Sequence, residues 1–304
     1  MTDIPGLIIR LQSGFYTVQS QDGIRVCNLR GRLKKGQRSG DVAALGDHVL
    51  VSPLAPDRGM IEEIVERQRA LSRTAPTPRG EYQQIIIANP DQAVFIFACA
   101  RPVARFGMLD RFLVIAEKQG IPAVIIANKV DLIGLEAARL LFDHYTRLGY
   151  PVVYTSVKTG EGFNELHGYL AGKISVFAGP SGAGKSSMLN VLLPDLRLKE
   201  QAVSQTTDKG KHTTVVRELY PLPGGGYVAD TPGLKALALW DIEAEELDGY
   251  FPEMHRLVEH CQFNNCTHVH EPGCAILAAV KAGQIHPVRY QSYLRMRFGE
   301  TEAT

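Results

Sequence analysis

The sequence predicts a multidomain protein with a small β-barrel at its N-terminus, a central α/β domain and a helical, metal-binding C-terminal domain. Three observations lead to this prediction. Residues 6–70 consist of short alternating runs between turn signals, residues 93–229 alternate apolar strands with helical stretches, and residues 261–274 hold three of the five cysteines. With 304 residues, the chain has ample length for two or three domains.

The composition excludes several classes of protein. Hydrophobic residues make up 45% and charged residues 21% of the chain, and no apolar run approaches the roughly 20 residues that span a bilayer. The N-terminus lacks the features of a secretory signal, and five cysteines are an odd number for a disulfide framework. We therefore expect a reduced, cytoplasmic protein without membrane association. The net charge of +1 leaves any nucleic-acid binding to local patches.

Residues 1–71 are expected to form the barrel. Apolar and polar residues alternate at 15–18, 24–27 and 48–51, with turn signals between these runs. This pattern is typical of a small antiparallel β domain. Residues 72–84 contain two prolines and almost no apolar side chains, so we expect a linker there.

Residues 72–237, which begin with this linker, are expected to form the central domain. Strands are predicted at 93–98, 123–127, 152–155, 174–178, 214–220 and 227–229, and helices at 109–118, 135–148, 163–170 and 184–193. Buried strands followed by helices indicate a mostly parallel sheet that is covered on both faces. Beyond about residue 240 the strands stop, which leaves residues 238–304 as a helical domain around the cysteines.

A phosphate-binding loop is predicted between the strand 174–178 and the helix that follows it. Residues 179–186 match the pattern G-x-x-x-x-G-K-[ST] in the structural context that this pattern requires. Backbone N–H groups surround the β-phosphate, Lys185 neutralises phosphate charge during catalysis, and the Ser186 hydroxyl ligates Mg²⁺. The residues expected to bind the nucleotide here are Gly179, Pro180, Ser181, Gly182, Ala183, Gly184, Lys185, Ser186 and Ser187.

A second motif predicts that the base is guanine. Asn128, Lys129 and Asp131 form the pattern N-K-x-D at the end of the strand 123–127, where doubly wound sheets bind ligands. An aspartate there accepts two hydrogen bonds from guanine, and adenine has no such pair of donors. Backbone N–H groups after the next strand would complete the base pocket, at Ser156, Val157 and Lys158.

Two further segments are predicted to surround the γ-phosphate and Mg²⁺. Asp230 opens the turn Asp-Thr-Pro-Gly after a strand and would hold Mg²⁺ through water, while the N–H group of Gly233 would meet the γ-phosphate. Thr214 would close over Mg²⁺ when the γ-phosphate is present, although Thr213 is an alternative. Together these motifs predict a GTP-binding protein that hydrolyses its nucleotide.

The order of these motifs is unusual. Ordinary small GTPases begin with the phosphate loop, whereas here the base-reading motifs at 128 and 156 precede it. The same sheet would form if the two ends of an ordinary GTPase were joined near residues 172–173 and the chain were opened after residue 233. Such a rearrangement is a circular permutation. With its N-terminal β domain and its cysteine cluster, nearly the whole chain resembles the circularly permuted GTPases that depend on the small ribosomal subunit, the RsgA (YjeQ/YloQ) family.

The resemblance implies an OB-fold barrel, a zinc domain and a role in late maturation of the small ribosomal subunit, with that subunit and its rRNA as partners. It also implies that the subunit stimulates hydrolysis of GTP to GDP. Leu234 stands where many GTPases have a glutamine that orients water, so another group must do so. His212 matches the family's switch histidine and could orient that water, unless it is a loop residue without a role. Val157 and Val215 depart from the alanine and threonine usual in the family.

The C-terminal cysteines predict one structural zinc ion. Cys261, Cys266, His268 and Cys274 form a Cys₃His set that closes a tetrahedral site with no open position. His270 does not match the family spacing and is not expected to bind the metal. The lone cysteines, Cys27 and Cys99, are expected to be buried thiols.

A basic run in the barrel is a candidate for RNA contact. Between residues 25 and 38 there are six basic residues and no acid: Arg25, Arg30, Arg32, Lys34, Lys35 and Arg38. They could form a groove for the RNA backbone, with Phe15 or Tyr16 available for stacking, or they could be an ordinary solvated loop. A weaker candidate near the C-terminus consists of Lys281, Arg289, Arg295 and Arg297.

Two other functions are compatible with these motifs. The protein could be an RNA-binding checkpoint that uses GTP as a conformational ligand, with hydrolysis incidental. It could also be a zinc-finger regulator, but the cysteine knot lacks an obvious base-reading helix, so DNA is not an expected partner. We expect a monomer, and our hypothesis is that the bound nucleotide sets the orientation of the zinc domain, because residues 230–233 run directly into it.

Overall fold

The computed structural model describes residues 3–34, 40–77, 80–194, 217–230 and 242–299. By the density of their internal contacts, the residues fall into two compact units. The barrel unit contains Met1–Gln92, His167–Phe177 and Lys185–Pro232, and the cluster unit contains Ala93–Leu166, Ala178–Gly184 and Gly233–Thr304. The predicted central domain contributes residues to both units, and the predicted domain bounds stay a prediction.

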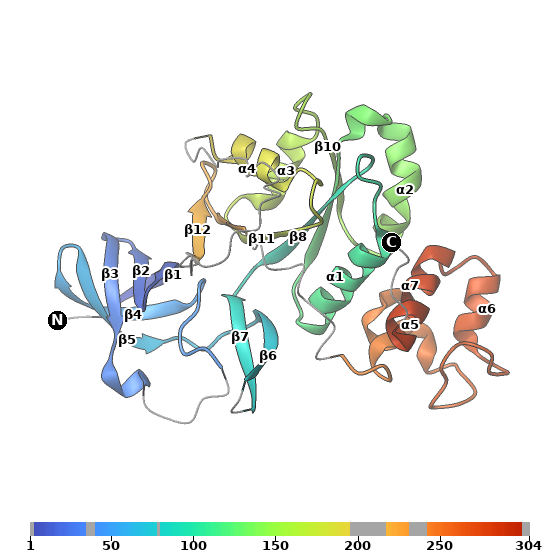
Figure 1. Cartoon of the computed structure of the whole chain (residues 1–304), viewed down its shortest axis with the longest axis horizontal. Helices are drawn as coiled ribbons and strands as arrows, with labels where there is room; N and C mark the ends of the chain where they lie inside the picture. Colours follow the sequence, from blue (N-terminus) through green and yellow to red (C-terminus); the bar gives the residue numbers. More distant parts are fainter. Residues whose placement is uncertain (1–2, 35–39, 78–79, 195–216, 231–241, 300–304) are drawn as a thin grey trace, which may run out of the picture. The chain divides into compact units, whose positions relative to one another are not determined.

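The N-terminal strands form a closed barrel (Figure 1, blue), which confirms the predicted barrel. They pair in the order β1-β2-β3-β5-β4, and β1 also pairs with β4. The expectation of a wholly antiparallel barrel is wrong, because the chain crosses over after β3 and β5 then runs parallel to β3. The elements are β1 (Ile4–Gln12), β2 (Phe15–Ser20), β3 (Gly23–Leu29), the 3-10 helix η1 (Gly31–Lys34), β4 (His48–Ala55) and β5 (Arg58–Ile64).

Alternation along these strands places one set of apolar side chains inside the barrel. Ile8, Val18 and Cys27 are among the buried residues of this core. Burial raises the pKa of the Cys27 thiol to about 11, so this cysteine stays protonated at neutral pH, as expected of a structural thiol. A Cβ on Gly59 would lie 2.6 Å from Val51 Cγ1 and 3.0 Å from Cys27 Sγ, so this strand position requires glycine.

The predicted linker at 72–84 is wrong. Residues 72–77 and 80–84 belong to an antiparallel hairpin of β6 (Ala70–Thr77) and β7 (Gly80–Ala88). The hairpin is attached to the segment before β4, because the N–H group of Ile85 donates to Asp41 Oδ2 at 2.9 Å. The buried apolar side chains that anchor this hairpin, Leu71, Ile85 and Ile87, lie just outside residues 72–84, so the composition of that stretch alone indicated a linker.

The barrel unit also contains three strands of the predicted α/β domain, which pair in the order β11-β13-β12. β11 and β13 are parallel, whereas β12 is antiparallel to β13. On its other side β12 pairs with β1 of the barrel, where Arg10 lies opposite Glu218. These elements are β11 (Ile174–Ala178), the helix α4 (Lys185–Leu192), β12 (Arg217–Pro221) and β13 (Tyr227–Asp230).

The cluster unit contains the parallel strands in the order β10-β9-β8. Every residue of β8 and β9 is buried, as expected of strands with helices on both faces. The predicted strands and helices agree with the structure to within a few residues. The elements are β8 (Gln92–Ala98), α1 (Phe106–Lys118), β9 (Ala123–Asn128), the 3-10 helix η2 (Val130–Leu132), α2 (Leu135–Arg147), β10 (Val152–Thr155) and α3 (Phe163–Leu170).

The C-terminal domain is helical, as predicted (Figure 1, red). Its helices pack around an apolar core that includes Phe251, Met254, Ile276 and Tyr293. Its elements are the 3-10 helix η4 (Leu247–Tyr250), α5 (Pro252–Val258), α6 (Ala275–Lys281) and α7 (Pro287–Phe298). Within the described residues, no helix combines the length and the apolar character needed to cross a bilayer.

A buried arginine joins this domain to α1. Arg289 in α7 forms ion pairs of 2.7 Å with Asp110 in α1 and with Glu253 in α5, and its side chain is 0% exposed. The guanidinium also lies 4.5 Å from the ring centre of Phe251. The candidate RNA contact at Arg289 is therefore wrong, because a side chain closed off from solvent cannot reach a phosphate backbone.

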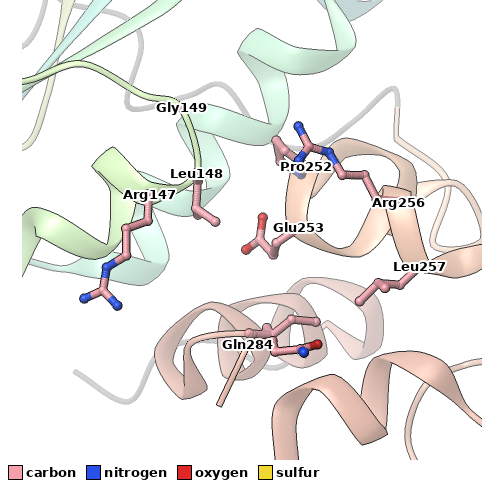
Figure 2. Close-up of a pocket in the computed structure, with 9 residues that line it drawn as sticks. Arg147, Leu148, Gly149, Pro252, Glu253, Arg256, Leu257 and Gln284 are labelled. Atoms are coloured by element: carbon pink, nitrogen blue, oxygen red, sulfur yellow. The ribbon is translucent and has the colours of Figure 1, made fainter. Parts of the chain in front are cut away.

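A groove of about 400 Å³ lies beside this joint, between the end of α2 and α5 (Figure 2). Arg147 points away from it, whereas Glu253 points toward α2. Glu253 accepts hydrogen bonds from Arg289 at 2.7 and 3.2 Å, so this carboxylate is not free to bind a cation.

Candidate nucleotide site and metal cluster

The phosphate loop follows β11, and two of its glycines are required by close packing. A Cβ on Gly179 would lie 2.1 Å from the backbone oxygen of Ile96. A Cβ on Gly184 would lie 2.3 Å from Asn128 Nδ2, and the φ angle of Gly184 is +97°. Both positions therefore exclude any larger residue, which explains the glycine pattern that identified the loop.

The loop presents a row of backbone donors. Among the residues that the structure describes, the N–H groups of Ser181, Gly182 and Gly184 have no hydrogen-bond acceptor in the protein. Successive N–H groups of this kind form an anion-binding nest, which is the function that the sequence pattern predicts for this loop.

Asn128 connects the loop to the ends of two strands. Its side chain is 1% exposed, and its Nδ2 donates to the backbone oxygen of Ala183 at 2.8 Å. Its Oδ1 accepts a hydrogen bond from Thr155 Oγ1 at 3.1 Å. Asn128 therefore holds the phosphate loop through the Ala183 carbonyl, and the predicted base-reading residue, Asp131, follows three residues later.

Asp131, the residue predicted to read guanine, is held in place by its neighbour Ser156. Its Oδ1 accepts a hydrogen bond of 2.7 Å from the buried Ser156 hydroxyl, which fixes the carboxylate while leaving other lone pairs for a ligand. In the described part of the chain, the N–H groups of Val157 and Lys158 donate to no protein group. The structure thus brings together the two predicted halves of the base pocket.

Lys129 bridges the phosphate loop and a turn that the sequence analysis did not identify. Its Nζ donates to the backbone oxygen of Gly182 at 2.7 Å and to that of Arg101. Arg101 follows β8, whereas Lys129 follows β9, so both lie beyond the carboxyl ends of neighbouring parallel strands. The contact uses the Arg101 carbonyl, and no side-chain motif marks such a group in a sequence.

The remaining nucleotide-site residues are placed only in part. Lys185 begins α4, and Asp230 ends β13. The Asp230 side chain lies outside the described residues, as do His212, Thr213, Thr214 and Gly233. Their roles stay predictions.

The four predicted metal ligands lie together. One ligand atom from each of Cys261, Cys266, His268 and Cys274 falls within 4.8 Å of all the others. His268 Nδ1 is 3.7 Å from Cys261 Sγ and 3.5 Å from Cys274 Sγ. Three thiols and one imidazole at this separation fit a closed, tetrahedral zinc site. His270 is exposed and lies outside the cluster.

Two carboxylates that sequence reasoning missed support this cluster. Asp248 Oδ2 lies 2.9 Å from His268 Nε2, which assigns the ring proton to Nε2 and leaves the lone pair of Nδ1 for a metal. Glu271 accepts hydrogen bonds from the N–H groups of Thr267 and Val269, at 2.7 and 2.9 Å. Burial opposes ionisation of Glu271, but a hydrogen bond from the Thr267 hydroxyl, together with these N–H bonds, outweighs it and holds the pKa of Glu271 well below the usual range.

The basic run of the barrel is partly neutralised. Arg30 Nη1 lies 2.6 Å from Glu62 Oε1, and Arg32 Nη2 donates to the backbone oxygen of Glu62 at 2.9 Å. Both arginine side chains remain more than half exposed. Lys35 and Arg38 lie outside the described residues, as does the side chain of Lys34. RNA contact at this surface stays a prediction.

A phosphate loop whose Ser181, Gly182 and Gly184 N–H groups find no acceptor within the described residues, next to an Asn-Lys-x-Asp motif that precedes it in the chain, defines a circularly permuted guanine-nucleotide-binding domain of the P-loop class. Comparison with family models agrees with this class. The chain matches the RsgA GTPase model over residues 64–240 and the RsgA N-terminal domain model over residues 5–61. The chain therefore belongs to the RsgA GTPase family, which confirms the resemblance seen in the sequence.

Individual relatives match over almost their full length. The small ribosomal subunit biogenesis GTPase RsgA of Gemmatimonas aurantiaca is 43% identical, with 97% of each chain covered. The crystal structure of YjeQ from Thermotoga maritima gives a TM-score of 0.77 at 34% identity, with 99% of this chain and 100% of that chain covered. YloQ, described as a circularly permuted GTPase, gives 0.76 at 32% identity, with 98% and 94% covered.

Proposed function

We propose that this protein hydrolyses GTP to GDP as a factor in the biogenesis of the small ribosomal subunit, and that the subunit stimulates this hydrolysis. The observation that carries the proposal is the match of nearly the whole chain to relatives named for that role. The N–H groups of Ser181, Gly182 and Gly184, which meet no acceptor in the part of the chain that the structure describes, and the adjoining Asn-Lys-x-Asp motif support the guanine-nucleotide part of the proposal independently.

Guanine recognition would depend on Asp131 and phosphate binding on the loop. Asp131, held by Ser156, would accept hydrogen bonds from N1–H and the exocyclic amine of guanine. The loop N–H groups and the Lys185 ammonium would stabilise negative charge on the phosphates. The hydroxyls of Ser186 and Thr214 would hold Mg²⁺, which would supply positive charge to offset the charge of the phosphates.

Hydrolysis requires a group that positions water. Because Leu234 has no hydrogen-bonding side chain, we infer that His212 takes this role, as the family resemblance implies. An imidazole is suited to it because it can accept a proton from water near neutral pH.

The Cys₃His cluster would hold one structural zinc ion. The donor set leaves no coordination position for a substrate, so the ion would stabilise the turns between α5 and α6, where regular structure is sparse. We also propose that the protein acts in the cytoplasm as a monomer and that its basic barrel residues contact rRNA. The exposed guanidinium groups of Arg30 and Arg32 support this last point.

The test is GTP turnover by the purified protein, alone and with isolated small ribosomal subunits. ATP as substrate and large subunits as additive are the controls. We expect turnover to rise strongly with small subunits and GTP only. Turnover that is slow and indifferent to every particle would overturn the proposed partner while leaving nucleotide binding intact.

A variant separates catalysis from nucleotide binding. His212→Ala should bind GTP as tightly as the natural protein but should lose most of its subunit-stimulated turnover, by roughly 10²- to 10⁴-fold. Unchanged turnover in this variant would exclude His212 as the water-positioning group.

A further inference from the structure

The turn between β8 and α1 lies against the phosphate loop. It runs from residue 99 to residue 105 and contains no helix or strand. Arg101 in this turn has a φ angle of +48°, in the left-handed region that arginine rarely adopts. Such a conformation persists only where surrounding contacts hold it.

Two contacts join the turn to the loop at the same residue, Gly182. Lys129 Nζ donates to the carbonyl oxygens of Arg101 and Gly182, so one ammonium group links both segments. In addition, a Cβ on Gly182 would lie 3.2 Å from Pro102 Cδ, so the proline ring packs against the loop where the loop has no side chain.

We propose that Pro102 is a positioning residue of the nucleotide site. The Pro102 ring supports the loop at Gly182, and Pro102 also keeps the carbonyl group of Arg101 directed at Lys129. The inference depends on the proposed function only in taking the loop to be a nucleotide site. The ligand that it concerns is the diphosphate common to GTP and GDP, because the N–H groups of this part of the loop are expected to face the β-phosphate.

This role predicts a specific kinetic signature. A support that acts on groups shared by GTP and GDP contributes equally to the ground state and the transition state. Its loss should therefore raise KM and leave kcat unchanged. A residue that only stabilised the fold would lower the amount of active protein, and the remaining molecules would keep the natural KM.

The experiment compares the natural protein with Pro102→Ala, Pro102→Val and Val103→Ala. Val103 is the matched control, because it is the next residue in the same turn and its side chain is 79% exposed. Binding is measured with mant-GDP and mant-GMPPNP, turnover by phosphate release, and folding by thermal unfolding. For Pro102→Ala we expect weaker binding of both nucleotides by roughly five- to tenfold, a similar rise in KM and an unchanged kcat.

Pro102→Val, which keeps bulk against Gly182, should recover part of this loss, and Val103→Ala should bind like the natural protein. If Pro102→Ala is too unstable to measure, Pro102→Val takes its place, and its nucleotide binding should still be weaker than that of the natural protein. The proposal is overturned if the folded Pro102 variants bind both nucleotides normally, or if only kcat falls. Failure of the natural protein to bind either nucleotide would instead overturn the proposed function itself.

Discussion

Replacing Arg289 by methionine removes the guanidinium that joins α7 to α1 and α5, but keeps a side chain of similar reach. Asp110 and Glu253 are then left as buried carboxylates without their cation, and their side chains are 0% and 6% exposed. Removing one partner of a buried ion pair costs about 3–5 kcal/mol. Asp110 Oδ1 would retain its bond from the Tyr145 hydroxyl, at 2.8 Å, so we expect a cost at the lower end of that range.

The assay is native-state hydrogen exchange of the amides in α7, supported by urea unfolding of the full chain. A loss of about 3 kcal/mol corresponds to exchange that is roughly hundredfold faster, if α7 exchanges by opening from α1. The effect should be largest in α7 and α5 and absent from the barrel strands, because the broken contacts lie within the cluster unit.

The matched control is Arg295→Met, the same chemical change at an exposed position of the same helix. It should leave exchange in α7 unchanged. Adding Asp110→Asn to Arg289→Met should recover part of the stability, because it removes one of the stranded charges. If Arg289→Met and Arg295→Met give the same exchange rates, the buried pair does not hold the C-terminal domain on α1, and the reasoning fails.

Three further predictions concern the site and its surroundings. Gly184→Ala should abolish mant-GDP binding, because its Cβ would lie 2.3 Å from Asn128 Nδ2. Glu271→Gln should weaken zinc retention against a colorimetric chelator roughly tenfold or more, since the carboxylate holds the turn that carries a ligand. Burial, the stacked His286 and the nearby Arg289 lower the pKa of His144 to about 4. Because the unfolded chain takes up this proton near pH 6.5, the free energy of unfolding should fall by about 1 kcal/mol between pH 7.5 and 5.5.

Each of these three predictions has a result that would contradict it. Normal nucleotide affinity of Gly184→Ala would mean that the loop does not pack on Asn128 as described. Zinc release from Glu271→Gln at the natural rate would show that the turn holds its shape without the carboxylate. A His144→Phe variant should lose the part of the pH dependence that this group causes, and an unchanged pH profile would assign that dependence to other groups.

The central strands and the nucleotide motifs were predictable because their signals are local. β8 and β9 are buried on both faces, so their sequences are unbroken apolar runs. The phosphate loop needs glycine at 179 and 184 because any Cβ would meet backbone or the Asn128 amide, and that requirement is visible as a sequence pattern. The gathering of the three cysteines and His268 was predictable for a similar reason, since cysteine and histidine at such short spacing are typical of a zinc site.

The errors have a common physical origin, which is pairing between residues distant in the chain. The hairpin of β6 and β7 was predicted to be a linker because its polar composition conceals backbone pairing. Arg289 was predicted to be a surface charge, although its partner Asp110 lies 179 residues earlier in the chain. The role of Asp248 was also missed, because Asp248 lies in η4, 20 residues before the His268 side chain that it contacts. Composition and spacing describe neighbours in the chain and carry no information on such partners.

The pairing of β1 with β12 has a practical consequence for dissecting the chain. Strand β12 pairs with β1 of the barrel along one edge, at Arg217 and Glu218, and with β13 along its other edge. Deleting the barrel would therefore leave the N–H and C=O groups of β12 as an open strand edge, which is a template for aggregation. Truncated forms that begin after the barrel are expected to self-associate, and a low activity in such a form would measure lost solubility as much as any function of the barrel.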